Sequence, residues 1–215
     1  MKKNREIPEG IYGITDGKSG IGKNILEYSE EILKGGVKIL QYREKKKCAR
    51  EKFEEAVLLK ELTKKYNAIF IVNDDIALAL AVDADGVHIG QDDLPLKEVR
   101  KIVGEDKIVG ISTHCPEEAK KALEDGADYI GVGPIFSTET KEDVCAPLGF
   151  EYLEYVEKNI EMPYVAIGGL KLHNLNEVIV RGCKRFAIVS EIVGAKNTLE
   201  KTIEIANYIK NSVKK

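Results

Sequence analysis

The feature that most constrains this sequence is a repeated alternation of short apolar runs with longer amphipathic stretches. Eight runs rich in Ile and Val are each followed by a segment with helical spacing of its apolar residues. The runs lack the strict polar alternation of a strand with one face in water, so they predict a parallel sheet buried on both faces. The predicted strands are residues 11–15, 37–42, 68–72, 86–89, 107–111, 129–132, 164–167 and 185–189.

Helices are predicted between these strands, which gives a succession of strand–helix units. The first predicted helix ends at Lys34, and the others cover residues 49–66, 76–82, 96–103, 116–125, 150–158, 173–180 and 199–212. Eight such units in 215 residues predict one α/β domain over residues 1–215, folded as a closed (β/α)8 TIM barrel. An open doubly wound sheet is the alternative, but the turn over residues 15–20 lacks the glycine pattern that binds dinucleotides.

Composition and charge exclude several classes of protein. The net charge is −3, so no basic surface indicates a nucleic-acid partner. The sequence has no run of 18 uncharged apolar residues and no apolar stretch after its charged start, so we expect neither a membrane span nor a signal peptide. Its four cysteines are scattered singly, without a zinc or disulfide pattern. We expect a cytoplasmic protein. The sequence does not determine its oligomeric state and leaves a homo-oligomer open.

Acidic and amide side chains follow two consecutive predicted strands. In a barrel of this kind the site lies at the C-terminal ends of the strands. The segments Asn73-Asp74-Asp75 and Gln91-Asp92-Asp93 follow the third and fourth strands. If those strands are neighbours, the carboxylates could meet and supply the oxygen ligands that Mg²⁺ prefers. The alternative is that these acids cap the helices that follow.

Basic residues follow the second predicted strand at every second position. Gln41, Arg43 and Lys45 share this spacing, so an extended chain points all three the same way. Two cations and an amide on one side of a strand end indicate a site for an anion such as a phosphate. The alternative is a solvated basic loop. Tyr42 and Glu44 face the other way, where they can pack and pair.

A second anion site is predicted on the opposite part of the barrel. Gly168-Gly169 ends the seventh strand, where exposed backbone N–H groups can bind phosphate, although a plain tight turn is the alternative. Thr138, Thr140 and Lys141 add hydroxyls and a cation in a long loop. Together these patterns predict a Mg²⁺-dependent enzyme that acts on one diphosphate and one phosphate.

The order and spacing of ten short motifs resemble the thiamine-phosphate synthase family along nearly the whole chain. The motifs are Tyr12-Gly-Ile-Thr-Asp16, Gln41-Tyr-Arg-Glu-Lys45, Val72-Asn-Asp74, His88-Ile-Gly-Gln-Asp-Asp93, Gly110-Ile-Ser112, Gly131-Val-Gly-Pro-Ile-Phe136, Thr138-Glu-Thr-Lys141, Pro147-Leu-Gly149, Ile167-Gly-Gly169 and Val189-Ser190. Two positions depart from the family pattern: Ser137 stands where proline is frequent, and Tyr42 where Leu or Phe is common.

The resemblance implies an enzyme that joins hydroxymethylpyrimidine diphosphate to hydroxyethylthiazole phosphate, giving thiamine phosphate and pyrophosphate. It implies Mg²⁺ as cofactor, with Asp74 and Asp93 as its ligands. Arg43, Lys45, Ser112 and Lys141 would be catalytic. The implied substrate contacts are Gln41, Tyr42, Arg43, Glu44, Lys45, Asn73, Ser112, Thr138, Glu139, Thr140, Lys141, Gly169, Val189 and Ser190.

Three other functions remain open at this stage. The related thiazole tautomerase branch has the same fold, and a binding paralogue without activity would have lost charged ligands. A more distant phosphate-handling barrel such as an epimerase is the third. Both predicted metal acids and the Thr138-Glu-Thr-Lys141 motif are present, which favours the synthase.

Overall fold

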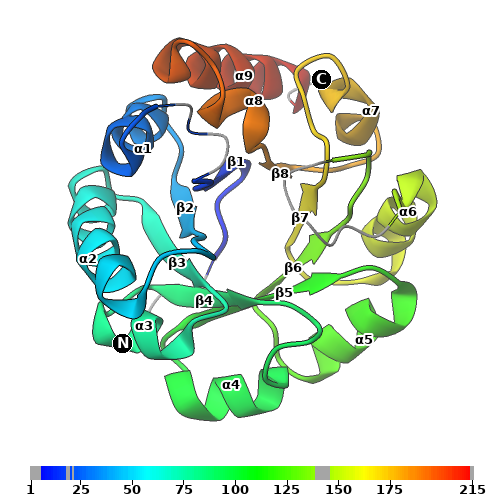
Figure 1. Cartoon of the computed structure of the whole chain (residues 1–215). Coiled ribbons are helices and arrows are strands. Elements are labelled where there is room, and N and C mark those ends of the chain that lie inside the picture. Colours follow the sequence, from blue (N-terminus) through cyan, green and yellow to red (C-terminus); the bar gives the residue numbers. More distant parts are fainter. Residues whose placement is uncertain (1–5, 18–19, 21, 139–145, 214–215) are drawn as a thin grey trace.

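The computed structural model describes residues 6–17, 20, 22–138 and 146–213, and these residues form a closed barrel of parallel strands with helices outside it (Figure 1). The strands follow one another around the barrel in chain order, and β1 (Gly10–Ile14) pairs with β8 (Arg185–Ala187) to close it. This pairing confirms the predicted (β/α)8 TIM barrel and excludes the open sheet. The other strands are β2 (Ile39–Tyr42), β3 (Ile69–Asn73), β4 (Gly86–Ile89), β5 (Ile108–Thr113), β6 (Tyr129–Val132) and β7 (Tyr164–Ile167).

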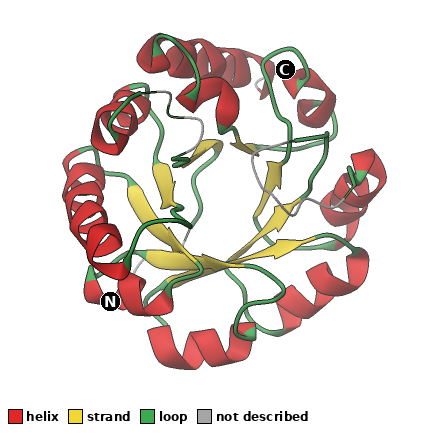
Figure 2. Cartoon of the chain, in the orientation of Figure 1, coloured by secondary structure: helices red, strands yellow, loops and turns green. Residues whose placement is uncertain are grey.

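The helices surround the strands on all sides, so the sheet has no face in water (Figure 2). They are α1 (Ile25–Lys34), α2 (Ala49–Lys65), α3 (Ile76–Ala81), α4 (Leu96–Val103), α5 (Pro116–Glu124), α6 (Gly149–Asn159), α7 (Leu175–Ile179), α8 (Ser190–Val193) and α9 (Thr198–Val213). This burial explains why the strands are continuously apolar. In the described part of the chain, no helix is both long and apolar enough to cross a membrane.

Alternate strand residues belong to two different cores. Ile39 and Ile71 pack in a cluster inside the barrel, whereas Leu40 and Phe70 pack in a larger cluster between the sheet and the helices. Because side chains alternate along a strand, the position two residues after Ile39 also faces inward, and that residue is Gln41. The inward positions therefore change from apolar to polar toward the C-terminal ends of the strands.

Two acidic residues fasten the opposite, N-terminal ends of the strands. Asp85 accepts hydrogen bonds from the Phe70 N–H, at 2.9 Å, and from Lys60. Asp128 does the same for the Val109 N–H, at 2.8 Å, and for Arg100. Each carboxylate thus joins a strand to a helix at the N-terminal end of the barrel, which is the end opposite the predicted site.

Several predicted boundaries are wrong. Strand β5 continues through Thr113, and β8 ends at Ala187, two residues before the predicted end. The four-residue helix α8 follows and was not predicted, because it is too short to show a periodicity. The cap of α4 is Pro95 and not Asp92, whereas Asp75 does cap α3 by accepting from the Leu78 N–H at 2.9 Å.

Candidate active site

Two cavities open side by side at the C-terminal ends of the strands. The larger has a volume of about 860 Å³ and is lined by Lys45, Asn73, Asp74 and Asp93, among others. The smaller, of about 400 Å³, is lined by Thr138, Gly168, Gly169, Val189 and Ser190, among others. Arg43 and Ser112 line both cavities, so they stand where the two meet.

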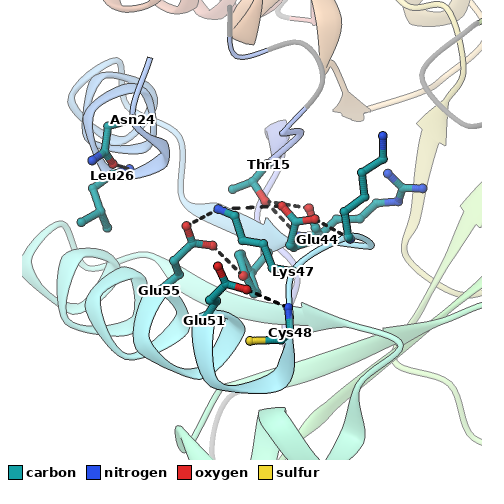
Figure 3. A network of polar contacts seen from close by, with 11 residues as sticks. Thr15, Asn24, Leu26, Glu44, Lys47, Cys48, Glu51 and Glu55 are labelled. Carbon is teal, nitrogen blue, oxygen red and sulfur yellow. Dashed lines mark hydrogen bonds and ion pairs between the residues drawn. The ribbon is translucent and has the colours of Figure 1, made fainter. Parts of the chain in front are cut away.

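The loop after β2 carries Arg43 and Lys45 to this mouth. Thr15, at the end of β1, holds the Arg43 backbone: its Oγ1 accepts from the Arg43 N–H at 2.9 Å and donates to the Arg43 carbonyl at 3.3 Å. Figure 3 shows that Lys47 of the same loop reaches Glu55 of α2, with Glu44 on its other side. The predicted alternation holds only in part: Tyr42 turns to α2, but Glu44 borders the same cavity as Arg43 and Lys45.

Tyr42 and Glu44 have different surroundings. Tyr42 is buried and its hydroxyl donates to Glu55 of α2, at 2.8 Å. The Glu44 carboxylate accepts from the Lys46 N–H at 2.7 Å, within its own loop. Burial and the neighbouring Glu55 carboxylate raise the pKa of Tyr42, so this phenol stays protonated. Tyr42 is thus a packing residue, while Glu44 also borders the larger cavity.

Asp74 is held over the mouth by an unusual backbone conformation. Its φ is +60°, in the left-handed region that few residues other than glycine adopt. Its N–H donates to the His88 carbonyl of β4, at 2.8 Å, which fixes the residue to the neighbouring strand. Its carboxylate forms an ion pair with Lys45. Asp74, predicted as a metal ligand, and Lys45, predicted as a phosphate contact, are thus in direct contact.

Asp93 lies close to Asp74, as the prediction of a shared metal site requires. Its carboxylate accepts from the Gly90 N–H at 2.7 Å, in a tight turn after β4. Desolvation raises the pKa of Asp93 above its ordinary value, and the Asp74 carboxylate raises it further. Two carboxylates that disfavour each other's charge fit a site for a cation.

The donor set fits Mg²⁺ in one particular way. Among the described residues, no three His, Cys, Asp or Glu side chains gather into a group that could hold a metal alone. Mg²⁺ is commonly held by one or two carboxylates together with substrate phosphates and water. Asp74 and Asp93 could therefore hold the ion only with oxygens from a bound diphosphate or from water.

The smaller cavity is shaped by two glycines that no other residue could replace. Gly168 and Gly169 have φ values of +101° and +62°. A Cβ at Gly168 would lie 2.5 Å from the Pro134 backbone, and one at Gly169 would lie 2.4 Å from the Ser137 carbonyl oxygen. The turn after β7 therefore requires glycine at both positions, because the loop after β6 packs directly against it. This steric reason holds whatever the cavity binds.

A chain of hydrogen bonds, buried at Gln41, Tyr12 and Tyr129, crosses the barrel and reaches the larger cavity at His88 and Ser112. The Gln41 amide donates to the Tyr12 hydroxyl at 3.1 Å, and Tyr12 contacts the Tyr129 hydroxyl at 2.6 Å. Tyr129 contacts His88 Nδ1 at 2.9 Å, and His88 Nε2 contacts the Ser112 hydroxyl at 3.0 Å. These contacts connect Gln41 with Ser112, two of the predicted substrate contacts from opposite parts of the barrel.

The sequence assigned no role to the two tyrosines in this chain. Burial raises the pKa of both Tyr12 and Tyr129, so both stay neutral and serve as hydrogen-bonding groups. The signal that could have found them is their inward register, since Tyr12 follows Ile11 and Tyr129 precedes Ile130, and both isoleucines face the helices. Gly110 makes room for Tyr129, because a Cβ there would lie 2.1 Å from its ring.

His114 and Glu118 form a polar pair that lines the smaller cavity. The Glu118 carboxylate accepts from the backbone N–H of His114 at 2.7 Å and contacts its Nδ1 at 3.1 Å. The pair joins the end of β5 to α5. Neither residue was assigned a role from the sequence, and Glu118 lies within a helix pattern.

Comparison with known proteins gives one consistent family for this fold and site. The model of one family, described as thiamine monophosphate synthase, matches residues 11–192. The chain belongs to the thiamine monophosphate synthase family. It is therefore an enzyme, a transferase of thiamine biosynthesis.

Individual relatives agree with this family over most of their length. A thiamine-phosphate synthase from Pelotomaculum thermopropionicum is 54% identical over 187 residues, which cover 87% of this chain and 86% of that one. Another from Caldicellulosiruptor saccharolyticus is 48% identical over 200 residues, covering 93% and 90%. The solved structure of a thiamine phosphate pyrophosphorylase from Pyrococcus furiosus matches with a TM-score of 0.86 and 34% identity, over 94% of this chain and 96% of that one.

Most of the site residues expected of a thiamine monophosphate synthase gather at the mouth, but not all. Arg43, Lys45, Asn73, Ser112, Thr138, Gly169, Val189, Ser190 and the two metal acids line one or both cavities. Gln41 is buried below them and lines neither. Glu139, Thr140 and Lys141 lie outside the described residues. Their predicted roles stay predictions.

Proposed function

We propose that this chain joins hydroxymethylpyrimidine diphosphate to hydroxyethylthiazole phosphate, forming thiamine phosphate and pyrophosphate with the help of Mg²⁺. The observation that carries the proposal is the pair of cavities that meet at Arg43 and Ser112. One is lined by cations and two apposed carboxylates, and the other by a Gly-Gly turn and the start of α8. A diphosphate with a metal ion suits the first, and a phosphate suits the second.

The reaction separates charge when pyrophosphate leaves, and the larger cavity is lined by charged side chains. Loss of pyrophosphate leaves a cation that the aminopyrimidine ring can delocalise. Arg43 and Lys45 would stabilise the negative charge that develops on the leaving group, and we assign Lys141 the same role. Mg²⁺, when bound, would supply further neutralisation of that charge. Asp74 and Asp93 would hold the ion, and Lys45, now paired with Asp74, would then turn to the diphosphate.

Orientation is the second contribution that the site would make. The thiazole nitrogen must approach the carbon from which pyrophosphate leaves, and the adjoining cavities would bring the two substrates together at Arg43 and Ser112. The nitrogen attacks as a neutral ring atom, so the step requires no general base. Gln41, Asn73 and Ser112 would contact the pyrimidine diphosphate. Thr138, Gly169, Val189 and Ser190, with Glu139 and Thr140, would seat the thiazole phosphate.

The remaining parts of the proposal follow from the substrates. Both are small phosphorylated molecules, so we propose small-molecule partners only, with neither nucleic acid nor membrane, and a cytoplasmic location. The whole chain, residues 1–215, would act as one domain. Oligomeric state does not enter the argument, because every described residue of the proposed site comes from one barrel.

Incubation of the purified protein with Mg²⁺ and both phosphorylated heterocycles tests the proposal. We expect thiamine phosphate and pyrophosphate in equal amounts, identified by mass spectrometry, and neither product when one substrate is omitted. The tautomerase and binding alternatives make a different prediction. If the protein binds the thiazole phosphate but forms no thiamine phosphate, the proposal fails and one of those alternatives replaces it.

A further inference from the structure

The loop after β2 holds four cations in five residues, yet it turns them in different directions. Arg43, Lys45, Lys46 and Lys47 lie between the end of β2 and the start of α2, with Glu44 among them. Arg43 and Lys45 turn to the mouth, where Lys45 pairs with Asp74. Lys47 instead reaches α2, as Figure 3 shows. Cations this close repel one another, so the direction of each must be fixed by specific partners.

Lys47 is held by two carboxylates, one from α2 and one from the loop itself. Its ammonium forms an ion pair with Glu55 of α2 and lies 4.0 Å from the Glu44 carboxylate. Both acids are largely shielded from water, with exposed side-chain fractions of 20% for Glu55 and 9% for Glu44. The hydrogen bond to Glu55 raises the pKa of Lys47, which therefore stays charged. The Lys47 side chain itself is 37% exposed, so the pair is only partly shielded from water.

The same carboxylates hold the backbone of the loop in place. Glu55 accepts from the buried Tyr42 hydroxyl through its other oxygen, at 2.8 Å, and so ties the end of β2 to α2. Glu44 accepts from the Lys46 N–H. At the far end, Glu51 accepts from the Cys48 N–H at 2.9 Å and caps the first turn of α2 (Figure 3). The loop is thus tied to α2 through Glu55, and Glu44 adds a hydrogen bond within the loop.

We propose that the Lys47–Glu55 ion pair, supported by Glu44, is a positioning device that fixes the loop carrying Arg43 and Lys45 at the mouth, where both side chains can reach the diphosphate. Lys47 acts through the loop and does not contact the ligand. The inference rests on the proposed function only in naming that ligand, since any diphosphate held by Arg43 and Lys45 would depend on the pair in the same way.

Two physical effects make the pair matter for binding. First, a loop that is already ordered loses little conformational freedom when the ligand binds, which preserves affinity. Second, the pair neutralises Lys47, so the loop directs its uncompensated charge to the mouth. Without the pair, Lys47 and Lys45 would compete for Asp74 and for the ligand. Supporting residues outside the contact shell often change affinity by about 10-fold to 100-fold when they are removed.

The test is a double-mutant cycle on the full chain, with inorganic pyrophosphate and Mg²⁺ as the probe in isothermal titration calorimetry. The variants are Lys47→Met, Glu55→Gln and the two combined. We expect each single variant to raise the Kd for pyrophosphate by about 10-fold. We expect the double variant to bind no more weakly than the weaker single variant, because both changes remove one and the same contact. Lys47→Arg keeps the ion pair and should bind like the wild type.

Lys101→Met is the matched control, since Lys101 forms an exposed ion pair with Glu98 within α4 and lines neither cavity at the mouth. It removes one cation and should leave the Kd for pyrophosphate unchanged. Thermal unfolding is recorded for every variant. If Lys47→Met fails to fold, the other two variants still test the inference. Glu55→Gln should raise the Kd for pyrophosphate by about 10-fold, and Lys47→Arg should leave it at the wild-type value.

Three results would overturn the inference. Lys47 also borders the larger cavity, and a direct contact with the ligand is the competing explanation. That explanation predicts weaker binding by Lys47→Met but equal or tighter binding by Glu55→Gln, which frees the lysine. Wild-type affinity in both single variants would also refute the device, as would additive losses in the double variant. Pyrophosphate binding is measured without turnover, so a failure of the proposed reaction would be recognised separately by the absence of thiamine phosphate.

Discussion

Asp74 is the residue whose backbone conformation is hardest to explain by packing alone. Its φ of +60° costs free energy for most residues, although Asp and Asn tolerate it better than others. The conformation carries its carboxylate toward Asp93 and Lys45 at the mouth. Asp75, the next residue, instead points back to cap α3. Asp75 therefore caps a helix, which was one of the two roles considered for these acids, while the role of Asp74 as a metal ligand stays a prediction.

Asp74→Asn should lower kcat/KM by about 100-fold or more at millimolar Mg²⁺, because the substitution removes a proposed metal ligand and a charge from the mouth. Asparagine also tolerates the left-handed conformation, so the free energy of unfolding should change little. Steady-state kinetics over a range of Mg²⁺ concentrations, together with urea unfolding, would measure both effects.

Asp75→Asn is the control for this variant. It removes the adjacent negative charge but keeps a good N-cap, so both turnover and stability should stay near the wild-type values. Near-normal turnover by Asp74→Asn would remove Asp74 from the metal site. An equal loss in both variants would show that only the net charge of the mouth matters.

Tyr129→Phe tests the buried hydrogen-bond chain. The change removes one hydroxyl and leaves Tyr12 and His88 each without one of their observed contacts. An unsatisfied buried polar group costs about 1–3 kcal/mol, so the free energy of unfolding in urea should fall by about that amount. A stability equal to that of the wild type would mean that water or rearrangement replaces the contact. This chain escaped sequence analysis because Tyr12 and Tyr129 are separated by 117 positions.

At the scale of secondary-structure elements, two acids do similar work at the starts of β4 and β6. Asp85 and Asp128 each accept a backbone N–H from the preceding strand and pair with a cation from a helix. Side-chain exposure is 12% for Arg100 and 10% for Asp128, so that ion pair is shielded from water. Neither acid is near the mouth, so both should affect stability and not catalysis.

Asp128→Ala should lower the free energy of unfolding by about 3–5 kcal/mol, because it leaves the buried Arg100 charge without its partner. Urea unfolding would measure the loss. Glu98→Gln, which breaks the exposed pair with Lys101 on the same helix, should cost less than about 1 kcal/mol. Equal effects of the two substitutions would show that burial of the Arg100–Asp128 pair adds nothing.

Apolar elements were predicted well, including the four-residue strands β4, β6 and β7, whereas a polar strand end and a single-turn helix were not. The apolar strands and the helices with several turns carry enough periodicity to be recognised. The end of β5, Ser112-Thr113, is polar and was predicted to be loop, and α8 has only four residues. Pro95 replaces Asp92 as the cap of α4, and Asp93 instead accepts from the Gly90 N–H. Such local choices depend on backbone geometry that residue type alone does not determine.

At the scale of the whole molecule, parallel order and strand polarity account for most of the site. Once eight strands follow one another around a barrel, the residues after each strand must meet at one end. That is why Arg43, Asp74, Asp93, Ser112 and Ser190 could be predicted as neighbours. Two separate anion sites were predicted, but the shapes of the two cavities were not, because they depend on side-chain volumes and on the close approach of the loop after β6 to the Gly-Gly turn.

This division is the central claim, since it assigns one substrate to each cavity. The decisive measurement is the KM of Lys45→Met and of Ser190→Ala for each substrate in turn. Lys45→Met should raise the KM for the pyrimidine diphosphate by at least about 10-fold, since it removes a charge-assisted contact, and leave the KM for the thiazole phosphate unchanged. Ser190→Ala should raise only the KM for the thiazole phosphate, by about fivefold. If both variants changed the KM for the same substrate, the assignment of one substrate to each cavity would be wrong.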